Sequence, residues 1–165
     1  MNPVLDWIVS STAGWSEAYA SSSALEATIL FLHLGGMVAA GGLAFTLDRA
    51  VLRSGRGWPR REDLARELHA SHGAVIWGLV VVFLSGVALT ASDPEIFLGS
   101  WIYWGKMATV VVLLWNGWLL KRSGERLLQD PEDEGVFLGL RNAALRSAGL
   151  WALSVFAGIA ITLYA

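Results

Sequence analysis

Residues 24–49 of the chain read ALEATILFLHLGGMVAAGGLAFTLDR. This stretch is long and apolar enough to cross a bilayer, because a helix rises about 1.5 Å per residue and the hydrocarbon core is about 30 Å thick. One ionisable side chain, His33, lies well inside it. A histidine is costly to keep inside a membrane span, so it marks a candidate functional site. The glycines and alanines around it would let a neighbouring helix or a flat ligand approach the backbone closely.

Three other stretches of the chain have the same apolar character. Their runs are continuous rather than alternating, which favours helices over the strands of a membrane barrel. The sequence therefore predicts an all-α integral membrane protein, an antiparallel bundle of four transmembrane helices forming one domain over residues 1–165. The predicted spans are residues 24–47, 70–92, 100–120 and 147–165. Residues 1–23 are predicted to be an interfacial helix or a flexible segment, and they lack the basic start of a signal peptide.

Composition narrows the classes of function. The chain has 165 residues, of which 55% are hydrophobic, and it has no cysteine. Disulfides, thiolate metal sites and cysteine nucleophiles are therefore excluded. The basic residues lie in short loops without a recognition motif, which argues against nucleic-acid binding.

Lysine and arginine are distributed very unevenly between the predicted loops. All but Lys106 lie after the first span or between the third and fourth: Arg49, Arg53, Arg56, Arg60, Arg61, Arg66, Lys121, Arg122, Arg126, Arg141 and Arg146. Since cytoplasmic loops carry the excess of basic residues, both termini are expected outside the cytoplasm.

His33 and Lys106 are the candidate pair for a site. His33 lies about 13 Å and Lys106 about 9 Å below the same membrane surface, at 1.5 Å per residue. We expect both to face the bundle interior around a small polar cavity, completed by Glu26 or by an anionic ligand group such as a propionate. Gly36 and Ala40 lie on or beside the face of His33.

Asn116 shares a helical face with Lys106, and Arg49 follows the first span, so both join the candidate ligand-binding residues. Each site residue also has a simpler interpretation. Lys106 would extend to the membrane surface, His33 would be a neutral histidine bonded to a hydroxyl or carbonyl group, and Asn116 would bond a neighbouring helix.

Histidine positions limit the ways in which a haem or a metal ion is bound. His33 and His72 are the two candidate metal ligands. They are separated by about 15–20 Å along the membrane normal, at 1.5 Å per residue. A single haem needs its two axial histidines at one depth, so this pair cannot bind one haem together.

Three segments carry a family resemblance: LHLGGMVAAGGLAFTLDR, HGAVIWGLVVVFLSGVALT and WIYWGKMATVVVLLWNGWLLKR. They resemble small four-helix membrane proteins of the copper-resistance-D-like group and the small membrane protoporphyrinogen oxidases. The resemblance implies a bacterial inner (plasma) membrane protein, in which the loop charges put both termini on the periplasmic side. His33, Arg49 and Lys106 match the histidine, the basic residue and the lysine of these proteins, and in the oxidases the histidine and the lysine serve haem or porphyrin chemistry. The third helix differs, because Trp115-Asn116 stands where the oxidases have a histidine.

Two classes of function follow. The first is a redox or ligand-handling membrane protein that binds a haem b, a porphyrin, a quinone or a metal ion near His33 and Lys106; whether it is an enzyme stays open. The second is a non-catalytic accessory subunit of a larger membrane complex for electron transfer or photosynthesis. Small residues on the first and fourth spans suit such a complex, a homo-oligomer or internal packing equally well.

Overall fold

The computed structural model of the chain describes residues 3–54 and 60–164. These residues form helices and no strand. The helices are α1 (Pro3–Ser21), α2 (Ser23–Ser54), α3 (Arg61–Ser92), α4 (Pro94–Gly99), α5 (Trp101–Gln129) and α6 (Glu134–Tyr164). The predicted all-α fold is confirmed.

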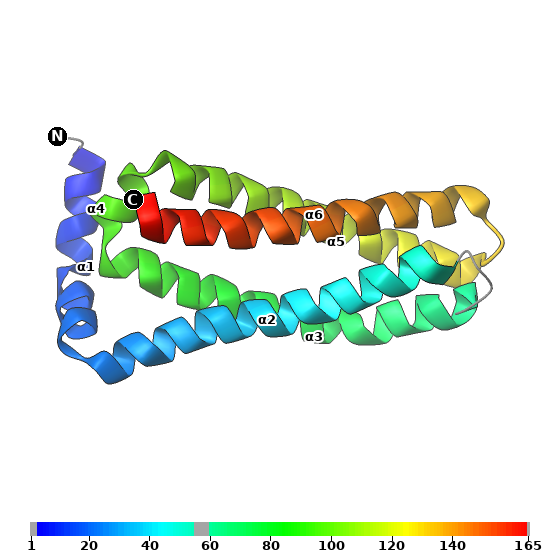
Figure 1. Ribbon diagram of the computed structural model, residues 1–165, viewed down its shortest axis with the longest axis horizontal. Coiled ribbons are helices and arrows are strands. Elements are labelled where there is room, and N and C mark those ends of the chain that lie inside the picture. Colours follow the sequence, from blue (N-terminus) through cyan, green and yellow to red (C-terminus); the bar gives the residue numbers. More distant parts are fainter. Residues whose placement is uncertain (1–2, 55–59, 165) are drawn as a thin grey trace.

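The four long helices form two antiparallel hairpins, α2 with α3 and α5 with α6 (Figure 1). Each hairpin packs more extensively within itself than against the other hairpin. Helices α1 and α4 lie at one end of the bundle, with α1 running across its long axis, and both chain ends lie here (Figure 1). We call this the capped end. At the other end, the loop end, α2 is followed by α3 and α5 by α6.

Three of the described helices, α2, α3 and α6, are long and apolar enough to cross a membrane. Their apolar side chains point mostly away from the bundle: Phe31 of α2 is 73% exposed, and Phe83 of α3 and Phe156 of α6 are similar. Such an outward apolar surface suits lipid as the solvent. The third predicted span, residues 100–120, falls on α5, which is not apolar enough to qualify. Lys106, Asn116 and several tryptophans lower its hydropathy.

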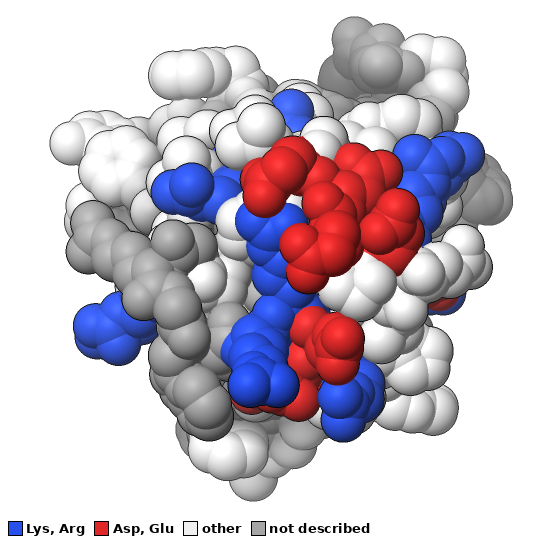
Figure 2. Space-filling model, turned by 90° about the vertical axis from the view of Figure 1, so that its right-hand side faces the viewer, with Lys and Arg blue, Asp and Glu red and all other residues white. Residues whose placement is uncertain are grey.

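The helices extend beyond the predicted spans at the loop end. Helix α2 continues to Ser54 rather than residue 47, and α3 begins at Arg61 rather than residue 70. The extensions are held together by a hydrophobic core of seven buried side chains from all four helices: Val51, Leu64, Ala65, Leu127, Phe137, Leu140 and Ala144. Their outer surface is charged, with acidic and basic side chains side by side (Figure 2). Arg56 lies outside the described residues.

The capped end holds two structures that hydropathy did not define. Residues 3–21 form a helix rather than a flexible tail, and its Trp15 Nε1 donates to the carbonyl of Ala88 at 2.8 Å. The segment between the second and third predicted spans contains the short helix α4, Pro94–Gly99. Asp93 caps that helix by accepting a hydrogen bond from the amide of Ile96 at 3.2 Å, as an N-terminal cap does.

Candidate functional site

A cavity of about 610 Å³ lies between the two hairpins, beneath α1. We call it the His33 cavity. His33 and Lys106 both line it, so the structure brings together the pair that the sequence singled out. Its volume is within the range of small-molecule and cofactor sites. The expectation of a small polar cavity is wrong, because most of its wall is apolar side chains from α3, α5 and α6.

His33 is fixed by hydrogen bonds to α3. Its Nδ1 lies 3.1 Å from the carbonyl oxygen of Val82 and 3.1 Å from Oγ of Ser85. A carbonyl oxygen can only accept, so Nδ1 carries the proton and Nε2 carries the lone pair. Gly86 makes this approach possible, since a Cβ there would lie 3.2 Å from Cε1 of the ring. The simpler interpretation of His33 as a histidine bonded to a carbonyl and a hydroxyl therefore accounts for Nδ1. It leaves Nε2 available to a ligand.

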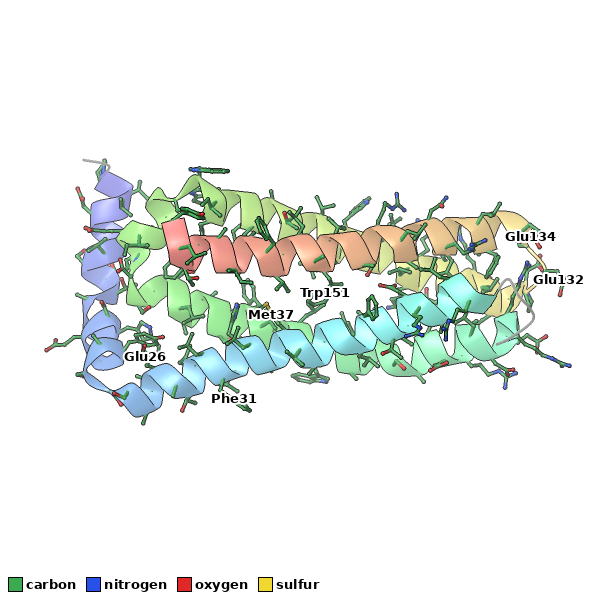
Figure 3. The ribbon with its side chains drawn as sticks, in the orientation of Figure 1. Glu26, Phe31, Met37, Glu132, Glu134 and Trp151 are labelled. Carbon is green, nitrogen blue, oxygen red and sulfur yellow. The ribbon has the colours of Figure 1, made fainter. Side chains whose placement is uncertain are left out.

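Lys106 points into the bundle. Its Nζ lies against α6, where a Cβ placed on Gly158 would be 3.4 Å away. Lys106 lines the same cavity as His33. Among the described residues no carboxylate forms an ion pair with it. Glu26, the acid expected to complete the site, is exposed beside α1 and does not line the cavity (Figure 3).

Several lining residues were not predicted from the sequence. Met37 lies one helical turn after His33, and its side chain points to the space between the hairpins, as does that of Trp151 (Figure 3). Tyr103 and Thr90 add hydroxyl groups, and Tyr103 Oη lies 3.4 Å from Oγ1 of Thr90. The i, i+4 spacing of His33 and Met37 is the one signal in the sequence that places any of them beside the site.

Four other candidate residues do not line the cavity. The Asn116 side chain is buried and donates to the carbonyl of Ala143 at 2.8 Å, so it joins α5 to α6 as the simpler interpretation holds. Gly36 and Ala40 lie in the α2–α3 contact: a Cβ on Gly36 would be 2.9 Å from Val82, and Ala40 is buried. Arg49 is exposed near the loop end.

The second metal candidate, His72, lines a different cavity of about 440 Å³ nearer the loop end. His33 and His72 therefore do not meet, in agreement with the depth argument from the sequence. In the described part of the chain, no group of three or more His, Asp or Glu side chains could hold a metal ion. A site for a bare metal ion has no support in this arrangement.

Comparisons of the chain with models of protein families, with curated proteins and with solved structures found no match.

Proposed function

We propose that this protein is a four-span membrane protein that binds haem b or a related porphyrin in the His33 cavity. The observation that carries the proposal is that His33 and Lys106 both line one largely apolar cavity. The apolar wall suits the faces of a flat macrocycle. Lys106 has no ion-pair partner among the described residues. Its ammonium group suits a carboxylate at the edge of the macrocycle, because a charge kept in an apolar cavity needs a partner.

The orientation of the His33 ring supports a role as axial ligand. A ligating histidine usually donates its other N–H to a carbonyl or carboxylate, which fixes the tautomer and the ring plane. His33 makes such a bond to Val82. Bound haem would supply one-electron redox chemistry, and the residues of this chain would orient it, shield it from water and hold its carboxylates.

A membrane span on α5 is part of this proposal. On α5 the polar side chains Lys106 and Asn116 point inward, whereas Trp101, Val111 and Trp115 are exposed. A helix with its polar groups toward the bundle interior and its apolar groups outside suits a position between the other helices and lipid. We place the basic loop end in the cytoplasm and the capped end outside, as in the copper-resistance-D-like and protoporphyrinogen-oxidase-like proteins that the sequence resembles.

Absorption spectroscopy tests the ligand. Protein purified in mild detergent, with haem supplied, should show a Soret band that His33→Ala abolishes. His69→Ala is the matched control, because His69 is exposed near the loop end and the band should stay unchanged. Lys106→Gln should keep the band and weaken haem retention, since it removes the partner of the carboxylate and not the axial ligand.

A protein that stays colourless after haem is supplied would contradict the proposal and favour the accessory-subunit alternative. That alternative requires stable co-purification with other membrane subunits after gentle extraction. The orientation is tested separately with a reporter fused after Ala165. If a reporter that works only in the cytoplasm is active at this position, the proposed orientation is wrong.

A further inference from the structure

The second cavity, of about 440 Å³, lies between α3 and α5 toward the loop end. We call it the Asp48 cavity. Asp48 of α2 lines it and is only 3% exposed. Ser147 of α6 lines the same cavity, and among the described residues the Oδ2 atom of Asp48 is buried without a hydrogen-bond partner. A buried carboxylate without a cationic partner is costly, and a cation beside the carboxyl group would lower that cost.

The charges around the Asp48 cavity do not balance. Lys121 is its lining cation of the Lys or Arg type, and it pairs with Glu125 at 3.8 Å on the same helix. His69 and His72 also line the cavity. None of the ion pairs among the described residues includes Asp48. The carboxylate of Asp48 is therefore the uncompensated charge of this cavity.

The rest of the wall favours an apolar body on the ligand. It consists mainly of aliphatic side chains, with the rings of Trp118 and Trp151 among them. Aromatic faces attract cations as well as apolar groups. Gly117 and Gly73 leave open space along the wall, because a Cβ on either would meet nothing within 4 Å.

From these observations we infer that the Asp48 cavity binds a lipophilic organic cation, an apolar molecule that ends in a protonated amine. The amine would pair with the carboxyl group of Asp48 from within the cavity, and the apolar body would lie against the walls of α3 and α5. The inference is independent of haem binding. Trp151 lines both cavities, so the two sites would be neighbours along the bundle axis.

Calorimetric titration of the full chain in detergent micelles tests the inference, with phenylbutylamine as the cation and phenylbutanol as its neutral analogue. Heats from micelles without protein are subtracted. The amine should bind saturably at one site, at least about tenfold more tightly than the alcohol, since a close charge pair in an apolar site is worth that much or more. Asp48→Asn should abolish that preference.

Two control variants are needed. One removes a negative charge elsewhere in the protein, and the other alters the His33 cavity. Glu67→Gln removes a negative charge from an exposed position near the loop end, and it should leave amine binding unchanged. His33→Ala should also leave it unchanged, because His33 does not line this cavity.

A second variant keeps the test decisive if Asp48→Asn does not fold. Gly117→Leu adds a side chain at the cavity wall, where a Cβ meets nothing within 4 Å, and it leaves Asp48 in place, so it should remove amine binding. Equal affinity of the wild-type protein for amine and alcohol would overturn the inference, as would unchanged amine binding in Asp48→Asn or Gly117→Leu.

Discussion

The two ends of the bundle are built by opposite rules. At the loop end the four helices bury leucine, valine and phenylalanine side chains in a hydrophobic core and expose charges (Figure 2). Toward the capped end most of the buried residues are small or polar, such as His33, Ala40, Ser85 and Ser154, with Ile161 as an exception, and most large apolar side chains point outward. The first arrangement is that of a protein in water, and the second is that of helices packed in lipid.

The difference decides where the chain has room for ligands. Burial of apolar surface from water drives the hairpins together at the loop end. In lipid that driving force is absent, and helices are held by close backbone contacts and hydrogen bonds. Within the α2–α3 hairpin the glycines provide such contacts, whereas between the hairpins both cavities remain. Both cavities therefore lie where the hydrophobic effect does not close the bundle.

The largest expected effect is in the loop-end core. Leu127 of α5 is fully buried there, whereas its neighbour Leu128 is 38% exposed. Leu127→Ala should lower the free energy of unfolding by about 2–5 kcal/mol, because it leaves a cavity in a packed core. Leu128→Ala should change it by less than about 0.5 kcal/mol. Reversible unfolding in detergent measures both, and equal effects would show that the loop end is not packed as a core.

A smaller effect is expected in the α2–α3 contact. A Cβ on Gly78 would lie 2.8 Å from Cβ of Ala40, and both atoms are held by rigid backbone. Gly78→Ala should therefore cost about 1–3 kcal/mol through overpacking. Gly73→Ala, on the same helix with open space around it, should be neutral or stabilising. A Gly78 variant as stable as the Gly73 variant would mean that the hairpin is not held by close backbone contact.

Hydropathy predicted the apolar parts of the long helices and missed their charged extensions at the loop end. The predicted spans end near residues 47 and 120, whereas α2 and α5 continue to Ser54 and Gln129. These extensions mix charged and apolar residues, so an average over a window does not detect them. Leu64 and Leu127 belong to a helical pattern of buried positions that only the packing of all four helices makes visible.

The candidate site was predictable only in part, from polar side chains whose burial in a membrane span costs free energy and therefore indicates a function. His33 and Lys106 are expensive inside a span, and both line one cavity. Asn116 is equally expensive, but it is used for a bond to α6, and the sequence alone does not distinguish the two uses. Asp48 was not predicted, because it directly precedes Arg49 at the end of the first span and resembles a membrane-surface charge.

The hydrogen bond that Asn116 forms between α5 and α6 is expected to contribute modestly to the free energy of unfolding. Its Nδ2 donates to the carbonyl of Ala143 at 2.8 Å in a buried position. Asn116→Leu should cost about 0.6–2 kcal/mol, the range for polar contacts between membrane helices. Asn142→Leu is the control, because Asn142 is exposed on the neighbouring helix. Thermal unfolding in detergent compares the two, and a stable Asn116→Leu protein would assign no role to this bond.

The smallest expected effect concerns α1, which closes the capped end without a hydrophobic core. None of the residues of α1 is fully buried, and Ser16 Oγ donates to the carbonyl of Ser92 at 2.7 Å. Ser16→Ala removes one such bond, worth about 1 kcal/mol, and should leave global unfolding nearly unchanged. The change should instead appear as faster hydrogen exchange of α1 amides, because a segment held by few contacts opens locally. Ser10→Ala is the matched control, since Ser10 bonds only within α1, to the carbonyl of Trp7. Ile8 and Thr12 of α1 line the His33 cavity, so the Ser16 variant should also release a bound ligand faster than the Ser10 variant does. Equal exchange in the two variants would show that α1 is held at the capped end by its apolar contacts alone.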